Sequence, residues 1–118
     1  MTRIDPLAAL LDDAARNAQG IDQIDPEGKM PMADAYAIQA ASIQRRLARG
    51  ETRQGVKMGF TSRSKMVQMG LSDVIWGRLT SGMRVEEGGK TSFARYVHPR
   101  AEPEIAFILK HALPADVT

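Results

Sequence analysis

The spacing of apolar residues changes near residue 50, and this change restricts the fold more than any other feature of the sequence. Before it, two segments follow the three-to-four-residue spacing of an amphipathic helix, at residues 6–19 and 33–49. After it, short glycine-flanked or continuously apolar segments are typical of strands and occur at 55–61, 74–79 and 104–109, with a brief helix at 62–69. Because the helices come first and the strands later, the sequence predicts an α+β fold rather than alternating βαβ units.

Local signals mark the ends of the two long helices. Asp5 can cap the first helix, and Pro6 suits its first position because a missing N–H costs nothing there. Gly20 and Gly50 follow the last apolar residues of the two helices and predict where each helix ends.

Charge and composition disfavour several classes of function. Residues 1–34 hold seven acidic and three basic residues, and residues 35–118 hold seven acidic and thirteen basic ones, so the second part favours an anionic small molecule. The whole chain has a formal net charge of only +2, and we expect no nucleic-acid partner. There is no cysteine, and no apolar run reaches the roughly 18 residues of a membrane span. We therefore expect a cytoplasmic protein without a membrane partner.

Two carboxylates stand at the start of the apolar segment 104–109. Glu102 and Glu104 are two residues apart, which on a strand puts both on one face at a separation of about 7 Å. Pro103 between them cannot donate to a sheet ladder, so they lie at a strand start or at an edge. Neighbouring carboxylates repel each other, and either a divalent cation such as Mg²⁺ or plain solvent exposure resolves the repulsion. Spacing alone leaves both interpretations open. We expect the strand that follows to be buried.

Lys57 is the second candidate for chemistry. It lies within an apolar, glycine-flanked segment, where partial desolvation would favour the neutral amine that acid–base chemistry needs. The alternative is a lysine on the solvent face of a half-buried strand. Neutral hydrogen-bonding groups follow it at Thr61, Ser62 and Gln68. Ser62 also suits a helix cap, and the other two suit plain surface.

Five sequence blocks occur together in order. They are Ala-Tyr-Ala-Ile-Gln at 35–39, Gly-Val-Lys-Met-Gly-Phe-Thr-Ser at 55–62, Lys-Met-Val-Gln-Met-Gly at 65–70, Trp-Gly-Arg-Leu at 76–79 and His-Pro-Arg-Ala-Glu-Pro-Glu-Ile-Ala at 98–106. From about Asp34 onward, the chain resembles the 2-keto-4-pentenoate hydratase and 4-oxalocrotonate decarboxylase family of the fumarylacetoacetate hydrolase superfamily. The glycine–lysine block and the Glu-x-Glu block make the resemblance specific, because unrelated folds would rarely contain both in this order.

The resemblance implies a metal-dependent lyase of aromatic meta-cleavage catabolism. Glu102 and Glu104 would be two of three carboxylate ligands to Mg²⁺ or Mn²⁺, with the third expected beyond Thr118. Lys57 would be the active-site lysine. The residues that would contact the substrate are Thr61, Ser62 and Gln68.

The implied substrate is a small 2-oxo acid, 4-oxalocrotonate, which would lose its distal carboxylate as CO₂ to form 2-hydroxypenta-2,4-dienoate. The ion would act as a Lewis acid on the oxo-acid end and stabilise the enolate that forms. The alternative is a 2-keto-4-pentenoate hydratase, which adds water to the dienoate. Met58, the 65–70 block and His98-Pro99 favour the decarboxylase branch.

The resemblance also implies a domain organisation. Residues 1–54 would form an N-terminal helical region, and residues 55–118 the start of a mixed β-rich, fumarylacetoacetate-hydrolase-like catalytic domain. Family members are much longer chains, so this domain is expected to be incomplete, with the chain truncated. The implied partners are further copies of the chain or a decarboxylase–hydratase complex. A further alternative is an inactive fragment or assembly module.

Overall fold

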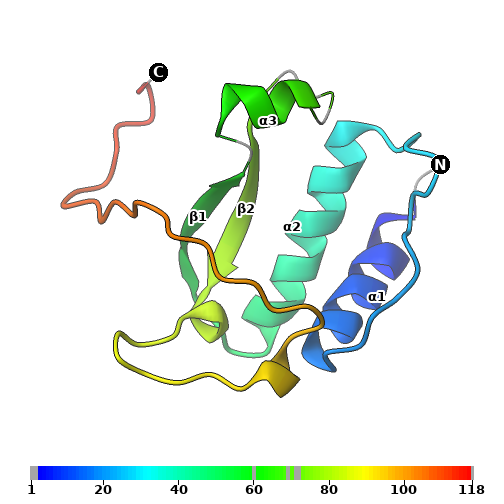
Figure 1. Ribbon diagram of the computed structural model, residues 1–118, viewed down its shortest axis with the longest axis horizontal. Coiled ribbons are helices and arrows are strands. Elements are labelled where there is room, and N and C mark those ends of the chain that lie inside the picture. The colour runs from blue at the N-terminus through cyan, green and yellow to red at the C-terminus, as the bar shows by residue number, and fades with distance from the viewer. Residues whose placement is uncertain (1–2, 60, 69, 71–72, 118) are drawn as a thin grey trace.

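The computed structural model describes residues 3–59, 61–68, 70 and 73–117, with Lys65 described by its backbone alone. Helices α1 (Ile4–Arg16) and α2 (Met32–Ala48) are followed by strand β1 (Arg53–Gly59), the short helix α3 (Arg63–Gln68) and strand β2 (Ile75–Thr80). Two single-turn 3₁₀ helices, at Ser81–Met83 and Phe93–Arg95, precede the C-terminal residues. Figure 1 shows α2 lying between α1 and the sheet. The predicted α+β class is confirmed.

The predicted helices and the first two predicted strands are present with small shifts at their ends. Phe60 of the first predicted strand and Met69 of the short predicted helix lie outside the described residues. Within the residues that the structure does describe, no helix is both long and apolar enough to cross a membrane.

Both ends of α1 differ from the prediction. Arg3 is the N-cap, so Pro6 is the third helical residue. Asp5 lies inside the first turn, where its carboxylate interacts favourably with the positive end of the helix dipole. At the other end Ala18 takes a left-handed φ of 50°, and the helix stops at Arg16 rather than at Gly20. A left-handed residue cannot continue a right-handed helix, which accounts for the earlier stop.

The end of α2 matches the prediction. Gly50 follows the C-cap residue Arg49 and has a φ of 100°, a conformation that glycine adopts without strain. The chain then turns into β1, and Glu51 in this turn accepts a hydrogen bond from the hydroxyl of Thr80 at the end of β2. The pKa of Glu51 is lowered by this hydrogen bond and by the nearby guanidinium of Arg46. These contacts join the end of α2 to the sheet.

Strands β1 and β2 form an antiparallel two-stranded sheet. Lys57 pairs with Gly77, and Met58 pairs with Trp76. Because side chains alternate along a strand, Lys57 points to the face of the sheet opposite to Met58. The sheet therefore separates the predicted active-site lysine from the face that carries the single tryptophan.

Side chains of α2 cover the outer edge of β2 in place of a third strand. The backbone N–H of Trp76 donates to Tyr36 Oη at 3.2 Å, and the Gln39 amide donates to the carbonyl oxygen of Trp76 at 3.1 Å. The backbone N–H of Arg78 donates to Gln39 Oε1 at 3.2 Å. The rings of Tyr36 and Trp76 stack with centroids 5.1 Å apart, and the Arg78 guanidinium lies 4.5 Å from the Trp76 ring centre. Three of the backbone groups at this edge that another strand would pair are thereby satisfied.

We expect Gln39→Ala to lower the free energy of unfolding by about 1–2 kcal/mol, because two half-buried backbone groups of β2 lose their partner. Urea denaturation followed by the fluorescence of Trp76 measures the change. Gln44→Ala, at an exposed position of the same helix, is the matched control and should leave stability nearly unchanged. Equal effects of the two substitutions would contradict a role for Gln39 in covering the edge.

The predicted strand at 104–109 is wrong. Residues 101–109 have no regular secondary structure, and Ile105, Phe107 and Ile108 are 87%, 87% and 98% exposed. A strand exists only where a neighbour pairs with its backbone groups, and no strand among the described residues does so here. Figure 1 shows this segment, in orange, running from the lower end of the helices across the sheet toward the C-terminus. The apolar character of this segment predicted that it would be buried, but no part of the described chain covers it.

Candidate active site

Lys57 and Glu104 are the two predicted site residues that the structure brings together. The Lys57 ammonium lies 3.9 Å from Glu104 Oε1, although the residues are far apart in the sequence. Gly77, opposite Lys57 on β2, has no side chain, and the lysine stem lies over it: a Cβ added there would lie 3.6 Å from Lys57 Cγ. The Lys57 and Glu104 side chains are 49% and 52% exposed. The expected desolvation of Lys57 is therefore not found, and an ion pair this open contributes at most about 1 kcal/mol.

Glu102 lies two residues before Glu104 in the exposed C-terminal segment. Both carboxylates are accessible to solvent, and Pro103 lies between them in a stretch without regular secondary structure. Among the described residues, no three histidine, aspartate or glutamate side chains gather closely enough to hold a metal ion. Glu102 and Glu104 thus supply two carboxylates of the kind that Mg²⁺ prefers. Among the described residues, no third ligand lies close enough to complete a metal site with them.

The other predicted site residues lie around α3, past the end of β1. Thr61, Ser62 and Gln68 are all exposed, and Gln68 is the last residue of α3. The carbonyl oxygen of Ser62 accepts a hydrogen bond from the backbone N–H of Met66 at 3.0 Å, so Ser62 stands at the start of the helix. This backbone position suits the alternative interpretation of Ser62 as a helix cap. Among the described residues, no hydrogen bond or ion pair joins these three side chains to Lys57 or Glu104, whose ion pair is with each other.

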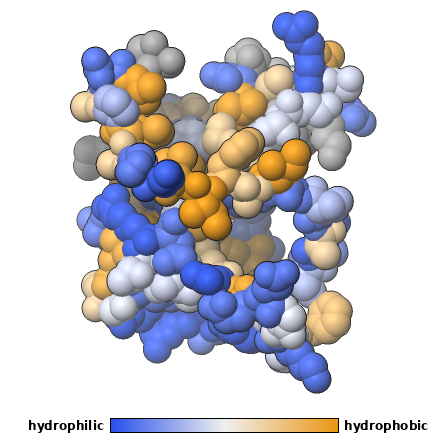
Figure 2. Space-filling view, turned by 90° about the vertical axis from the view of Figure 1, so that its left-hand side faces the viewer, coloured by the Kyte–Doolittle hydropathy of each residue, from blue (hydrophilic) through white to orange (hydrophobic). Residues whose placement is uncertain are grey.

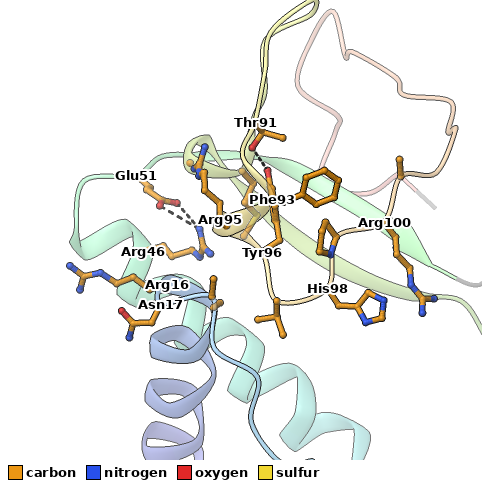
Figure 3. Close-up of a pocket in the computed structure, with 18 of the residues that line it drawn as sticks. Arg16, Asn17, Arg46, Glu51, Thr91, Phe93, Arg95, Tyr96, His98 and Arg100 are labelled. Carbon is orange, nitrogen blue, oxygen red and sulfur yellow. Dashed lines mark hydrogen bonds and ion pairs between the residues drawn. The ribbon is translucent and has the colours of Figure 1, made fainter.

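A cavity lies elsewhere in the molecule, and no motif of the sequence predicted it. It has a volume of about 1340 Å³ and lies between the C-terminal ends of α1 and α2 and residues 91–101. Five arginines, His98 and Glu51 contribute to its lining, whereas none of the six predicted site residues does. Figure 3 shows Arg16 and Arg100 extending away from each other at opposite sides, and Arg46 joined to Glu51. Arg16 and Arg100 therefore do not point to a common position in the cavity.

The ion cluster beside this cavity joins the two long helices. Asp12 of α1 is 1% exposed, and its carboxylate accepts hydrogen bonds from Arg45 Nε at 2.8 Å and from Arg49 Nη1 and Nη2 at 2.6 and 2.8 Å. Arg46 Nε lies 4.0 Å away. The hydrogen bond from Arg49, opposed by burial and reinforced by Arg45, lowers the pKa of Asp12 from 3.8 to about 2. The buried carboxylate of Asp12, held by Arg45 and Arg49 of α2, therefore forms an interhelical clamp.

The chain matches no protein-family model, but it is similar to individual enzymes. A 4-oxalocrotonate decarboxylase from a Pseudomonas species is 48% identical over 98% of this chain and 45% of the relative. A 2-keto-4-pentenoate hydratase from Paraburkholderia phymatum is 34% identical over 97% of this chain and 44% of the relative. The chain belongs to the 4-oxalocrotonate decarboxylase and 2-keto-4-pentenoate hydratase family.

A solved structure of this family agrees with the fold. The 4-oxalocrotonate decarboxylase from Pseudomonas putida G7, in complex with magnesium and adipate, superposes with a TM-score of 0.67 and 36% identity. The superposition covers 72% of this chain and 34% of the decarboxylase chain. The same enzyme has also been solved with calcium and acetate. The chain spans less than half the length of these decarboxylase and hydratase relatives.

Proposed function

We propose that this chain carries part of the active site of a metal-dependent lyase that converts 4-oxalocrotonate to 2-hydroxypenta-2,4-dienoate and CO₂. The observation that carries the proposal is the 48% identity to a 4-oxalocrotonate decarboxylase along almost the whole chain. Residues 1–54 are then a helical region, and residues 55–118 the start of a fumarylacetoacetate-hydrolase-like catalytic domain. We place the protein in the cytoplasm, as a homo-oligomer or in a decarboxylase–hydratase complex.

Glu102 and Glu104 are the proposed metal ligands, with a third carboxylate supplied by residues beyond Thr118. Their accessible carboxylates fit Mg²⁺ or Mn²⁺, which favour hard oxygen donors. When bound, the ion would polarise the 2-keto group of the substrate. The solved decarboxylase in complex with magnesium supports this choice of cation.

Lys57 would act on the substrate beside these ligands. Its ammonium lies close enough to Glu104 to reach a molecule bound there, and it carries the charge needed to hold a carboxylate. From the same position it can donate a proton to the reacting carbon chain. Neutral contacts to the substrate would come from Thr61, Ser62 and Gln68.

The second candidate function is the hydration of 2-hydroxypenta-2,4-dienoate, because hydratases also match almost the whole chain. The two reactions share a 2-oxo acid and a divalent metal. They differ in product, because decarboxylation releases CO₂ and hydration adds water without carbon loss. We therefore expect Mg²⁺-dependent release of CO₂ from 4-oxalocrotonate once the site is complete. A hydrated product without CO₂ would assign the chain to the hydratases. If neither product forms, the alternative role as an inactive assembly module is favoured.

Metal binding tests the ligand assignment directly. We expect the chain to bind Mg²⁺ weakly, with a Kd on the order of 1 mM, because two exposed carboxylates form an incomplete site. Glu104→Gln should weaken this binding about tenfold or more, measured by titration calorimetry. Glu87→Gln, at an exposed turn, is the matched control. Binding that is equally strong in both variants would exclude Glu104 as a ligand.

A further inference from the structure

Two neighbouring parts of the molecule have the character of strands that lack a partner. The first is the segment 105–109, in which Ile105, Phe107 and Leu109 alternate with Ala106 and Ile108. All five residues are exposed, and Leu109 is 62% exposed. Apolar side chains on both faces are typical of a strand that is covered on both sides of a sheet. Such a segment, when exposed to water, favours association with another strand or another chain.

The second is the outer edge of β1. Trp76 and Arg78 direct their backbone groups away from β1 toward α2, so their register partners Met58 and Val56 must direct theirs away from β2. Within the described residues no further strand pairs with this edge. Val56 and Met58 are 62% and 43% exposed. The edge of β2 is covered by side chains of α2, whereas the edge of β1 is open.

Both surfaces lie on the same side of the molecule. Lys57 of β1 contacts Glu104, the residue directly before the apolar segment. Figure 1 shows the C-terminal segment passing over the sheet and continuing beyond β1, on the side away from the helices. Figure 2 views the molecule from that side and shows hydrophobic surface between the hydrophilic regions. One additional sheet could therefore cover both surfaces.

We propose that the segment 105–109 and the edge of β1 form one docking surface for the part of the family fold that this chain does not span. The length of the relatives supports this occupant, because the chain accounts for only 45% of a decarboxylase that it otherwise matches from end to end. Docking adds strands beside β1 and pairs 105–109 as a strand, by the backbone hydrogen bonding of β-augmentation. These residues cover the docking surface in the same way whether they belong to the same polypeptide or to a separate one. The inference rests on family membership and not on the proposed lyase activity.

The test mixes this chain with a separate polypeptide that contains the remaining part of the Pseudomonas decarboxylase. Native mass spectrometry gives the stoichiometry, and hydrogen exchange gives the location of the contact. We expect a one-to-one complex in which the amides of 56–58 and 105–109 exchange at least tenfold more slowly than in the chain alone. Absence of a complex, or a complex without protection at these amides, would overturn the proposal. Protection of these amides in the chain alone, increasing with the concentration of the chain, would overturn the proposal too. A second copy of the chain would then cover the surface.

Two substitutions in the exposed segment sharpen the test without disturbing the fold. Ile108→Asp places a charge on the docking surface, and Phe107→Pro removes a backbone N–H that a new strand would pair with. Each should weaken the complex at least tenfold. Met32→Asp, at a 56% exposed position at the start of α2, is the control and should leave binding unchanged. Equal binding by all three variants would contradict docking at 105–109. A complex that forms without catalytic turnover would count against the lyase and leave the docking surface in place.

Discussion

Replacing Asp12 by asparagine should lower the free energy of unfolding by about 2 kcal/mol at neutral pH, because the decrease of its pKa from 3.8 to about 2 corresponds to this stabilisation of the charged form. The buried carboxylate accepts hydrogen bonds from Arg45 and Arg49. Asparagine keeps the shape of the side chain and loses the charge. Arg45 and Arg49 then lose the anion that they share, and only the more exposed carboxylates of Asp13 and Glu51 remain near the arginines of α2.

The pH dependence of this effect has a definite sign. A carboxyl group whose pKa is lower in the folded state stabilises the fold above its unfolded pKa and loses this contribution as the pH falls through its folded pKa. The difference in stability between the natural chain and Asp12→Asn should therefore be complete above about pH 4 and decrease toward about pH 2. Urea denaturation at a series of pH values measures this difference.

A neighbouring aspartate provides the matched control for Asp12. Asp13 forms one ion pair with Arg45 at 2.8 Å, but its side chain is 54% exposed. Asp13→Asn should cost less than about 1 kcal/mol, since exposed ion pairs contribute little. Similar losses at the two positions, or a loss at Asp12 that does not change between neutral and acidic pH, would contradict the role of burial.

Replacing Lys57 by methionine should lower kcat/KM for 4-oxalocrotonate about 10²–10⁴-fold in the chain assembled with the remaining part of the family fold, if Lys57 holds or protonates the substrate. Methionine preserves the length of the stem over Gly77 and removes the ammonium. Lys90→Met, at an exposed position outside the strands, is the control. Full activity of Lys57→Met would remove the lysine from the proposed site.

An arginine at position 57 separates the two roles of the lysine. Arginine keeps the positive charge that holds a carboxylate, but it does not give up a proton in the range where lysine does. If Lys57→Arg has the KM of the natural chain but the low kcat of Lys57→Met, the result would indicate proton transfer by Lys57. Recovery of both parameters would indicate that the charge alone is needed.

The long helices and the first two strands were predictable because their signals are local. The apolar spacing of α2 and the glycine after it depend on neighbours in the sequence, and so does the glycine-flanked strand that carries Lys57. The early end of α1 at Arg16 was not predictable, since Ala18 gives no sign of its left-handed φ. Nothing in the local pattern could show that side chains of α2 would cover the edge of β2.

The candidate site depends on both levels. The Glu-x-Glu and glycine–lysine blocks identified Glu102, Glu104 and Lys57, and they led to the correct family before any geometry was known. The sequence by itself thus determined the family and the α+β class, and it predicted the residues that we propose to bind an anion and a metal. Only the tertiary structure decided that Lys57 meets Glu104 in a half-exposed ion pair, and that Asp12 is a buried clamp. It also decided that residues 105–109 lie uncovered, because burial and strand pairing depend on which surfaces meet and not on the apolar character of the segment alone.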